Sequence, residues 1–230
     1  MREHKPRPFV DLMVSIVIPS LILMKLSSTE DLGATNALVL ALAFPLSWGS
    51  FELIYYRKFN FIALLGLISV LLTGGIGLLE IDNKWLAIKE AAIPGLIGIG
   101  VLISTFTRYA LIRTIVLNKA IIQVDAIIEQ LNKNGTIEIF NNRLRNANFL
   151  FSGTFVFSSI MNYILAKWIV VSPSGSSAFN EELGRLTFLS YPMIAIPSMI
   201  MMIGIMYYLW RTVTRLTGLT LEDVLVTKSD

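Results

Sequence analysis

Charged side chains inside apolar segments are the residues of this sequence best suited to chemistry, because placing a charge in a membrane is costly. Lys89 and Glu90 lie about a turn after Trp85, near the start of a long apolar segment. Adjacent residues of a helix do not face each other, so we expect each to find a partner on another segment or in a wet crevice. Asn162 and Lys167, in a later apolar segment, complete a candidate polar site or pathway. The alternative is structural ion pairing near the membrane surface.

Catalytic and metal-binding patterns are missing from the sequence. It has no cysteine, and its single histidine, His4, lies in the N-terminal tail, which excludes disulfides, thiolate metal sites and a haem held by two histidines. No acid–base pair accompanies a nucleophile, and no glycine-rich phosphate loop follows a strand. We therefore expect no enzymatic activity, no metal and no cofactor.

Four prolines fall near the middle of apolar segments, and they are Pro19, Pro45, Pro94 and Pro197. Each lies about ten residues into its segment, or roughly 15 Å of helix, which is half the hydrocarbon thickness of a bilayer. We therefore expect kinks near mid-membrane. Three of the prolines belong to similar pentapeptides, Ile-Pro-Ser-Leu-Ile at 18–22, Ile-Pro-Gly-Leu-Ile at 93–97 and Ile-Pro-Ser-Met-Ile at 196–200. Two interpretations stay open: kinks that improve packing, or an inverted repeat of the first three segments on the last three, as in many transporters.

The elements that must position these residues are six apolar segments, each close to the roughly 20 residues that a spanning helix needs. The composition is 54% hydrophobic and 15% charged, whereas about a quarter of the residues of a soluble domain are charged. The sequence predicts an all-α polytopic membrane protein, with residues 1–230 forming a single membrane domain. The six transmembrane helices are expected at about 9–26, 32–55, 61–79, 85–109, 147–171 and 187–210.

The basic residues predict the orientation, because lysine and arginine in short loops stay on the cytoplasmic side. With the N-terminus inside, 14 of the 19 lysines and arginines fall on that side. The other five are Lys25, Lys84, Lys89, Lys167 and Arg185. We expect both termini to be cytoplasmic. Topology and contact with anionic lipid account for the net charge of +3 without a nucleic-acid partner.

The long connection between the fourth and fifth segments, about 110–146, has the pattern of an amphipathic helix. Its apolar residues recur at alternating steps of four and three and predict one face of a helix, made by Leu117, Ile121, Val124, Ile128 and Leu131. Asn134-Gly135 predicts a turn at its end. Such a helix lies on the cytoplasmic leaflet or against the bundle, and the alternative is a helix that docks a partner.

Two further signals are local. The stretch from Ser172 to Arg185 is rich in serine, glycine and proline, and we expect a flexible loop there. Near the C-terminus, Gly218 breaks the helix, and Thr220 with Asp223 predicts the cap of a short helix.

Several short motifs resemble the bacterial intracellular septation protein A family over about residues 50–170, although the cytoplasmic connection here is longer. They are Tyr56-Arg57-Lys58, Thr73-Gly74-Gly75, Trp85 with Lys89, Leu102-Ile103-Ser104, Leu111-Ile112-Arg113, and Asn162 with Ala166 and Trp168. The whole chain is more similar to a sister group of uncharacterised bacterial six-span proteins, some of them labelled transporters. That likeness rests on residues 89–94, 178–185 and 215–218.

This resemblance implies a multi-pass protein of the bacterial inner membrane that contributes to cell-envelope maintenance or septation. We expect a non-enzymatic scaffold whose partners are the lipid bilayer and a second copy of the chain or other inner-membrane proteins. The alternative is a small transporter or channel, which the prolines and the pair Lys89 and Glu90 favour. A polar cavity that reaches Glu90 favours transport, and a filled apolar interior favours the scaffold.

Overall fold

The computed structural model describes residues 13–56, 61–107, 111–117 and 122–224. His4, the first residues of the predicted span from Phe9, Arg57 and Lys58 of the family motif, the predicted span end at Tyr109 and Ile121 lie outside the described residues. The contacts group the chain into two compact units, Met1–Ile93 with Ser159–Ala195, and Pro94–Ser158 with Ile196–Asp230. That residues 1–230 form a single membrane domain stays a prediction.

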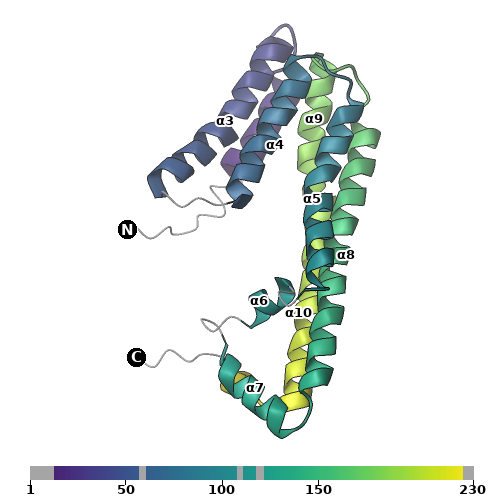
Figure 1. Ribbon diagram of the computed structural model, residues 1–230. Helices are drawn as coiled ribbons and strands as arrows, with labels where there is room; N and C mark the ends of the chain where they lie inside the picture. Colours follow the sequence, from purple (N-terminus) through teal and green to yellow (C-terminus); the bar gives the residue numbers. More distant parts are fainter. Residues whose placement is uncertain (1–12, 57–60, 108–110, 118–121, 225–230) are drawn as a thin grey trace. The chain divides into compact units, whose positions relative to one another are not determined.

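Every regular element in the described part of the chain is helical, so the all-α prediction is confirmed (Figure 1). Each predicted span coincides with a helix over most of its described residues. Two π-helical turns, labelled η, precede α2 and α10. The elements are η1 Met13–Val17, α2 Ile18–Lys25, α3 Gly33–Tyr56, α4 Phe61–Leu78, α5 Lys84–Ser104, α6 Leu111–Val116, α7 Val124–Lys133, α8 Ile137–Ile169, α9 Ser177–Ser190, η2 Tyr191–Ala195, α10 Ile196–Thr217 and α11 Leu221–Val224.

Four helical stretches among the described residues are long and apolar enough to cross a membrane: Gly33–Phe51, Lys84–Ser104, Ile137–Ile169 and Ser177–Thr217. Two shorter apolar helical stretches are Met13–Lys25 and Ile68–Leu78. Large apolar side chains point outward from these helices, among them Leu96, which is 69% exposed, and Ile203, which is 60% exposed. Apolar surface of this kind is unfavourable in water and favourable in lipid. The chain is a helical, membrane-embedded protein.

In the first unit, α2 packs between α3 and α9, and α4 lies beside α3 (Figure 1). The core contains Leu38 of α3, Leu86 of α5, Leu165 of α8 and Phe179 of α9. Helix α9 approaches α2 very closely at Gly184, where a Cβ atom would lie 2.7 Å from the backbone oxygen of Ser20. A glycine is therefore needed at this contact.

Helix α9 occupies most of the stretch from Ser172 to Arg185, so the prediction of a flexible loop there was wrong. The Ser176 hydroxyl caps the helix by accepting a hydrogen bond from the Phe179 amide at 3.1 Å. Glu182 accepts hydrogen bonds from the amides of Val171 and Ser172, both at 2.9 Å, and ties α9 to the end of α8. The sixth apolar segment is consequently helical from Ser177 and not only from residue 187.

The four prolines lie in two kinds of local structure, and the predicted kinks stay a prediction. Pro19 and Pro197 are each the second residue of an α-helix that follows a five-residue π-helical turn. A proline clashes with the carbonyl four residues before it, and the wider π turn leaves room there. Pro45 and Pro94 lie inside α3 and α5. A π-helical turn followed by a proline is therefore shared by the first and sixth apolar segments. An inverted repeat of the first three segments on the last three would instead pair the first segment with the fourth.

In the second unit, α7 packs against α10 and α11. The core contains Ile112, Ile127, Leu131, Phe140 and Leu209. Buried Asn148 of α8 joins its neighbours through its amide. The amide donates to the backbone oxygen of Val101 at 2.8 Å and to the Thr105 hydroxyl at 2.6 Å, and it accepts from the Ile112 amide at 3.0 Å. This polar cluster holds α8 against the end of α5 and the start of α6.

The amphipathic helix of the connection exists but is shorter than predicted, and its face differs. Helix α7 begins at Val124 and buries Val124, Ile127 and Leu131, while Ile128 is only half-buried. Leu117 lies just after α6 and is not part of it. The predicted turn at Asn134-Gly135 is confirmed, since Gly135 has a φ of +65°, and α8 already begins at Ile137.

The predicted cap at the C-terminal end is also present. Gly218 has a φ of +75°, which ends α10. The Thr220 hydroxyl accepts from the Asp223 amide at 3.4 Å, and the Asp223 carboxylate accepts from the Thr220 amide at 2.9 Å. This reciprocal capping box starts α11.

Candidate functional site

The first unit has a partly open cavity of about 320 Å³ that contains the charged pair singled out from the sequence. Its walls come from η1, α2, α3, α4, α5, α8, α9 and η2. Half of the lining residues are aliphatic or proline, and the other half carry a polar or charged group. A volume of this size is at the lower end of the range of roughly 300–1,000 Å³ that is usual for small-molecule sites.

Lys89 and Glu90 form an ion pair with each other, with Nζ 2.6 Å from the Glu90 Oε1 atom. The Lys89 ammonium also donates a hydrogen bond to the Thr73 hydroxyl of α4 at 2.6 Å. The Lys89 side chain is 9% exposed and that of Glu90 is 26% exposed. The expectation that these neighbours do not face each other was wrong, because both side chains are long enough to reach around the helix surface.

Further polar groups line the same cavity from other helices. Thr187 and Ser190 of α9 donate their hydroxyl protons to backbone oxygens four residues earlier, at 2.9 Å and 2.8 Å. Their oxygen lone pairs therefore remain as acceptors. Ser69 of α4 and Asn162 of α8 also line the cavity. A bound molecule would meet an ammonium, a carboxylate, an amide and several hydroxyl groups.

Both π-helical turns contribute to the cavity wall. Ser15 and Ile16 come from η1, and Tyr191 comes from η2. Such turns occur often at functional sites, because the wider turn disturbs the regular helix hydrogen bonds. Pro19 and Pro45 line the cavity as well, whereas Pro94 and Pro197 do not.

The structure brings together three of the four residues proposed as a polar site. Lys89, Glu90 and Asn162 share the cavity. Lys167 does not line it, because its side chain is exposed and its ammonium lies 5.9 Å from the centre of the Tyr163 ring. Sequence reasoning missed Thr73 as a partner of Lys89. Its position four residues after Ser69, on one face of an apolar helix, was the available signal.

The chemistry that this arrangement supports is binding. The ion pair offers both signs of charge without a net charge, and the hydroxyl and amide groups add hydrogen-bonding capacity. In the described residues, no group of three or more His, Asp and Glu side chains could hold a metal ion. The site is suited to a small molecule or ion with polar groups, held between apolar helices.

Fold and cavity together define a class, a helical membrane-embedded protein with a polar cavity among its helices. Comparisons of the chain with protein-family models, with curated proteins and with solved structures found no match. The resemblance to the septation protein A family stays a prediction.

Proposed function

We propose that this chain is a small transporter or channel that binds a polar solute or an ion at the Lys89–Glu90 pair. The observation that carries the proposal is the cavity of about 320 Å³ around this pair. A charged pair that served only the packing of two helices would not need open space and hydroxyl groups beside it. Intramembrane ionisable residues are costly, and they commonly mark substrate or ion pathways.

The proposed topology has six spans with both termini in the cytoplasm of a bacterium, and the chain lies in the inner membrane. It combines the four long apolar stretches with the two shorter ones, Met13–Lys25 and Ile68–Leu78. The excess of lysine and arginine on one side sets the orientation. In this topology, Glu90 lies about 9 Å along α5 from its outer end at Lys84. A solute would therefore reach the pair from the outer side over a short distance.

The scaffold function remains a prediction, but the geometry favours it less. A scaffold that acts through helix contacts with its own copies or with other inner-membrane proteins would be expected to have a filled apolar interior around Glu90. The cavity at this position instead supports solute binding. Envelope maintenance is compatible with either activity, since a transporter can serve the envelope as well as a scaffold can.

Flux through purified protein in proteoliposomes tests the proposal. A broad panel of small solutes and ions is measured with and without a proton gradient, for the intact chain and for Glu90→Gln. The matched control is Glu181→Gln, which removes the same charge from an exposed pair with Arg185 outside the cavity.

The expected result is a flux that Glu90→Gln abolishes and Glu181→Gln preserves. Two results would overturn the proposal. If well-folded intact protein carries none of the solutes, the scaffold function becomes the better account. If a flux exists but is the same in Glu90→Gln, the pair is not on the path.

A further inference from the structure

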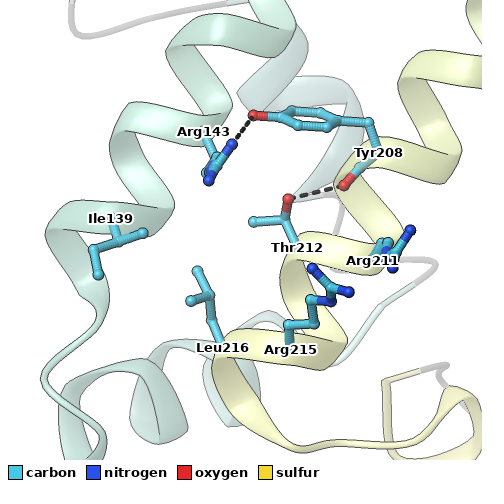
Figure 2. A pocket seen from close by; sticks show the side chains of 7 residues that line it. All are labelled: Ile139, Arg143, Tyr208, Arg211, Thr212, Arg215 and Leu216. Carbon is cyan, nitrogen blue, oxygen red and sulfur yellow. Dashed lines mark hydrogen bonds between the residues drawn. The ribbon is translucent and has the colours of Figure 1, made fainter.

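A second pocket, in the other unit, has a very different charge. It lies between α8 and α10, has a volume of about 270 Å³ and does not involve Lys89 or Glu90 (Figure 2). Seven residues line it, namely Ile139, Arg143, Tyr208, Arg211, Thr212, Arg215 and Leu216. Three arginines therefore surround one small space.

Helix spacing explains why the α10 residues face the same way. Tyr208, Arg211 and Arg215 are separated by three and four residues, which places them on one face of α10. On α8, Arg143 follows Ile139 by four residues and faces Tyr208 across the pocket (Figure 2). The two helices thus present their basic residues to a common space.

Tyr208 orients Arg143 toward this space. The Arg143 Nη1 atom donates a hydrogen bond to the Tyr208 hydroxyl at 3.4 Å, and the guanidinium carbon lies 6.0 Å from the centre of the tyrosine ring. Both contacts leave most guanidinium N–H groups available, because arginine has five donors.

Among the described residues, no carboxylate pairs with the arginines of this pocket. The ion pairs that join two described residues are Lys84–Asp82, Lys89–Glu90, Lys133–Glu129 and Arg185–Glu181. None of them involves Arg143, Arg211 or Arg215. All three arginines are exposed, so a ligand can reach them. Like charges around one space repel each other, and a bound anion would relieve that repulsion.

We propose that this pocket binds a phosphate group, carried by an anionic lipid headgroup or by a free phosphate. Guanidinium groups match phosphate oxygens with paired hydrogen bonds, which explains why arginine recurs at phosphate sites. Basic pockets between membrane helices on the cytoplasmic side bind anionic headgroups in other proteins. The pocket lies at the C-terminal end of Ser177–Thr217, a stretch long and apolar enough to cross a membrane, and in the proposed topology this end is at the cytoplasmic surface. The proposal does not rest on the transport function.

The test uses the full chain in nanodiscs with two probes. In the first arm, the discs contain phosphatidylcholine with added phosphatidylglycerol, and native mass spectrometry measures the phosphatidylglycerol that the protein retains. In the second arm, the discs contain phosphatidylcholine alone, and calorimetry measures the binding of inorganic phosphate. The variant is Arg211→Gln with Arg215→Gln. The control, Arg145→Gln, removes an exposed arginine of α8 that does not line the pocket.

The expected result is binding of at least one probe, weakened about tenfold or more in the double variant, because each lost charge-assisted hydrogen bond has a large effect. Retention of phosphatidylglycerol alone identifies a lipid headgroup, and binding of inorganic phosphate identifies a free phosphate. Arg145→Gln should stay within about twofold of the intact chain.

Two results would overturn the proposal. One is that neither probe binds the intact chain. The other is that Arg145→Gln weakens binding as much as the double variant does, because binding would then depend on surface charge in general. If the double variant does not fold, Arg143→Gln replaces it and removes one arginine from the α8 side of the same pocket, with the same expectations.

Discussion

The cavity of the first unit and the pocket of the second unit differ in whether their charged side chains have partners of opposite charge. Around Lys89, one cation and one anion lie 2.6 Å apart in a cavity whose lining is half apolar and half polar. Around Arg215, three cations share a space with no carboxylate within ion-pair distance among the described residues. Charge among apolar helices needs a partner from the chain itself, since desolvation is costly. Exposed cations near the end of a helix remain hydrated, so they need no counter-ion from the chain and are available to a ligand.

Removing one partner of the paired charges should have the largest effect. Lys89→Met leaves the Glu90 carboxylate without its counter-ion, and we expect a loss of about 3 kcal/mol in the free energy of unfolding. Arg215→Gln removes a charge with no such partner and should stay within about 0.5 kcal/mol. Equilibrium unfolding in detergent micelles measures both. Equal losses in the two variants would contradict the distinction between the two sites.

The double variant Lys89→Met with Glu90→Gln sharpens this prediction. It removes both charges at once, so most of the stability lost in Lys89→Met should return. A double variant as unstable as Lys89→Met would mean that packing by the lysine stem, and not the stranded carboxylate, explains the loss.

A glycine contact between α9 and α2 should give the next largest effect. In Gly184→Ala the new methyl group would meet the Ser20 backbone oxygen, and we expect a loss of about 1–3 kcal/mol as α9 moves away from α2. Gly204→Ala in the second unit meets no atom within 4 Å and should be neutral or stabilise the helix by up to about 1 kcal/mol. Equilibrium unfolding of both variants in the same detergent measures the two changes in the free energy of unfolding. A neutral Gly184→Ala would show that the helices can separate at no cost.

The smallest effect concerns Asp82, which precedes α5. Its carboxylate accepts a hydrogen bond from the Lys84 amide at 2.9 Å and pairs with the Lys84 ammonium at 3.0 Å, and these contacts lower the pKa of Asp82 from its ordinary value of 3.8. A lowered pKa in the folded state means that the carboxylate stabilises the fold at neutral pH and that this contribution is lost as the pH falls below 3.8. Asp82→Ala should therefore lower the thermal midpoint slightly at pH 7, with the difference vanishing in acid. A difference that persists in acid would assign the effect to something other than the carboxylate charge.

Residue patterns alone located the long apolar helices, except for the start of α9, and three polar residues of the cavity. Long apolar runs predicted both ends of α3 and α4 and the start of α5 to within one residue, because a spanning helix leaves little choice of length, but α5 ends at Ser104 and not at 109. Lys89, Glu90 and Asn162 could be chosen because polar groups are rare in such runs. Their assembly with Thr73 could not be predicted, since it depends on how α4 and α5 pack.

Predictions from residue types and their spacing were wrong where contacts between distant segments determine the structure. The stretch after Val171 is rich in serine and glycine, which favours a loop, yet Glu182 reaches back to the end of α8 and stabilises α9. On α7 the steps of four and three placed Val124 and Leu131 correctly on the buried face, but the buried residue between them is Ile127 and not Ile128. The arginine pocket was missed altogether, because Arg143 and Arg211 are far apart in the sequence.

The water content of the first cavity is the most direct test of this account. The chain has no cysteine, so a single Ser69→Cys on the cavity wall can be probed with a charged, membrane-impermeant thiol reagent added from either side of the membrane. The control is Leu71→Cys on the same helix, at a side chain that is 56% exposed and apolar. We expect Ser69→Cys to react roughly tenfold faster or more, because a thiol must ionise in water to react. If it reacts no faster than Leu71→Cys, the cavity is closed to water and cannot be a polar solute site.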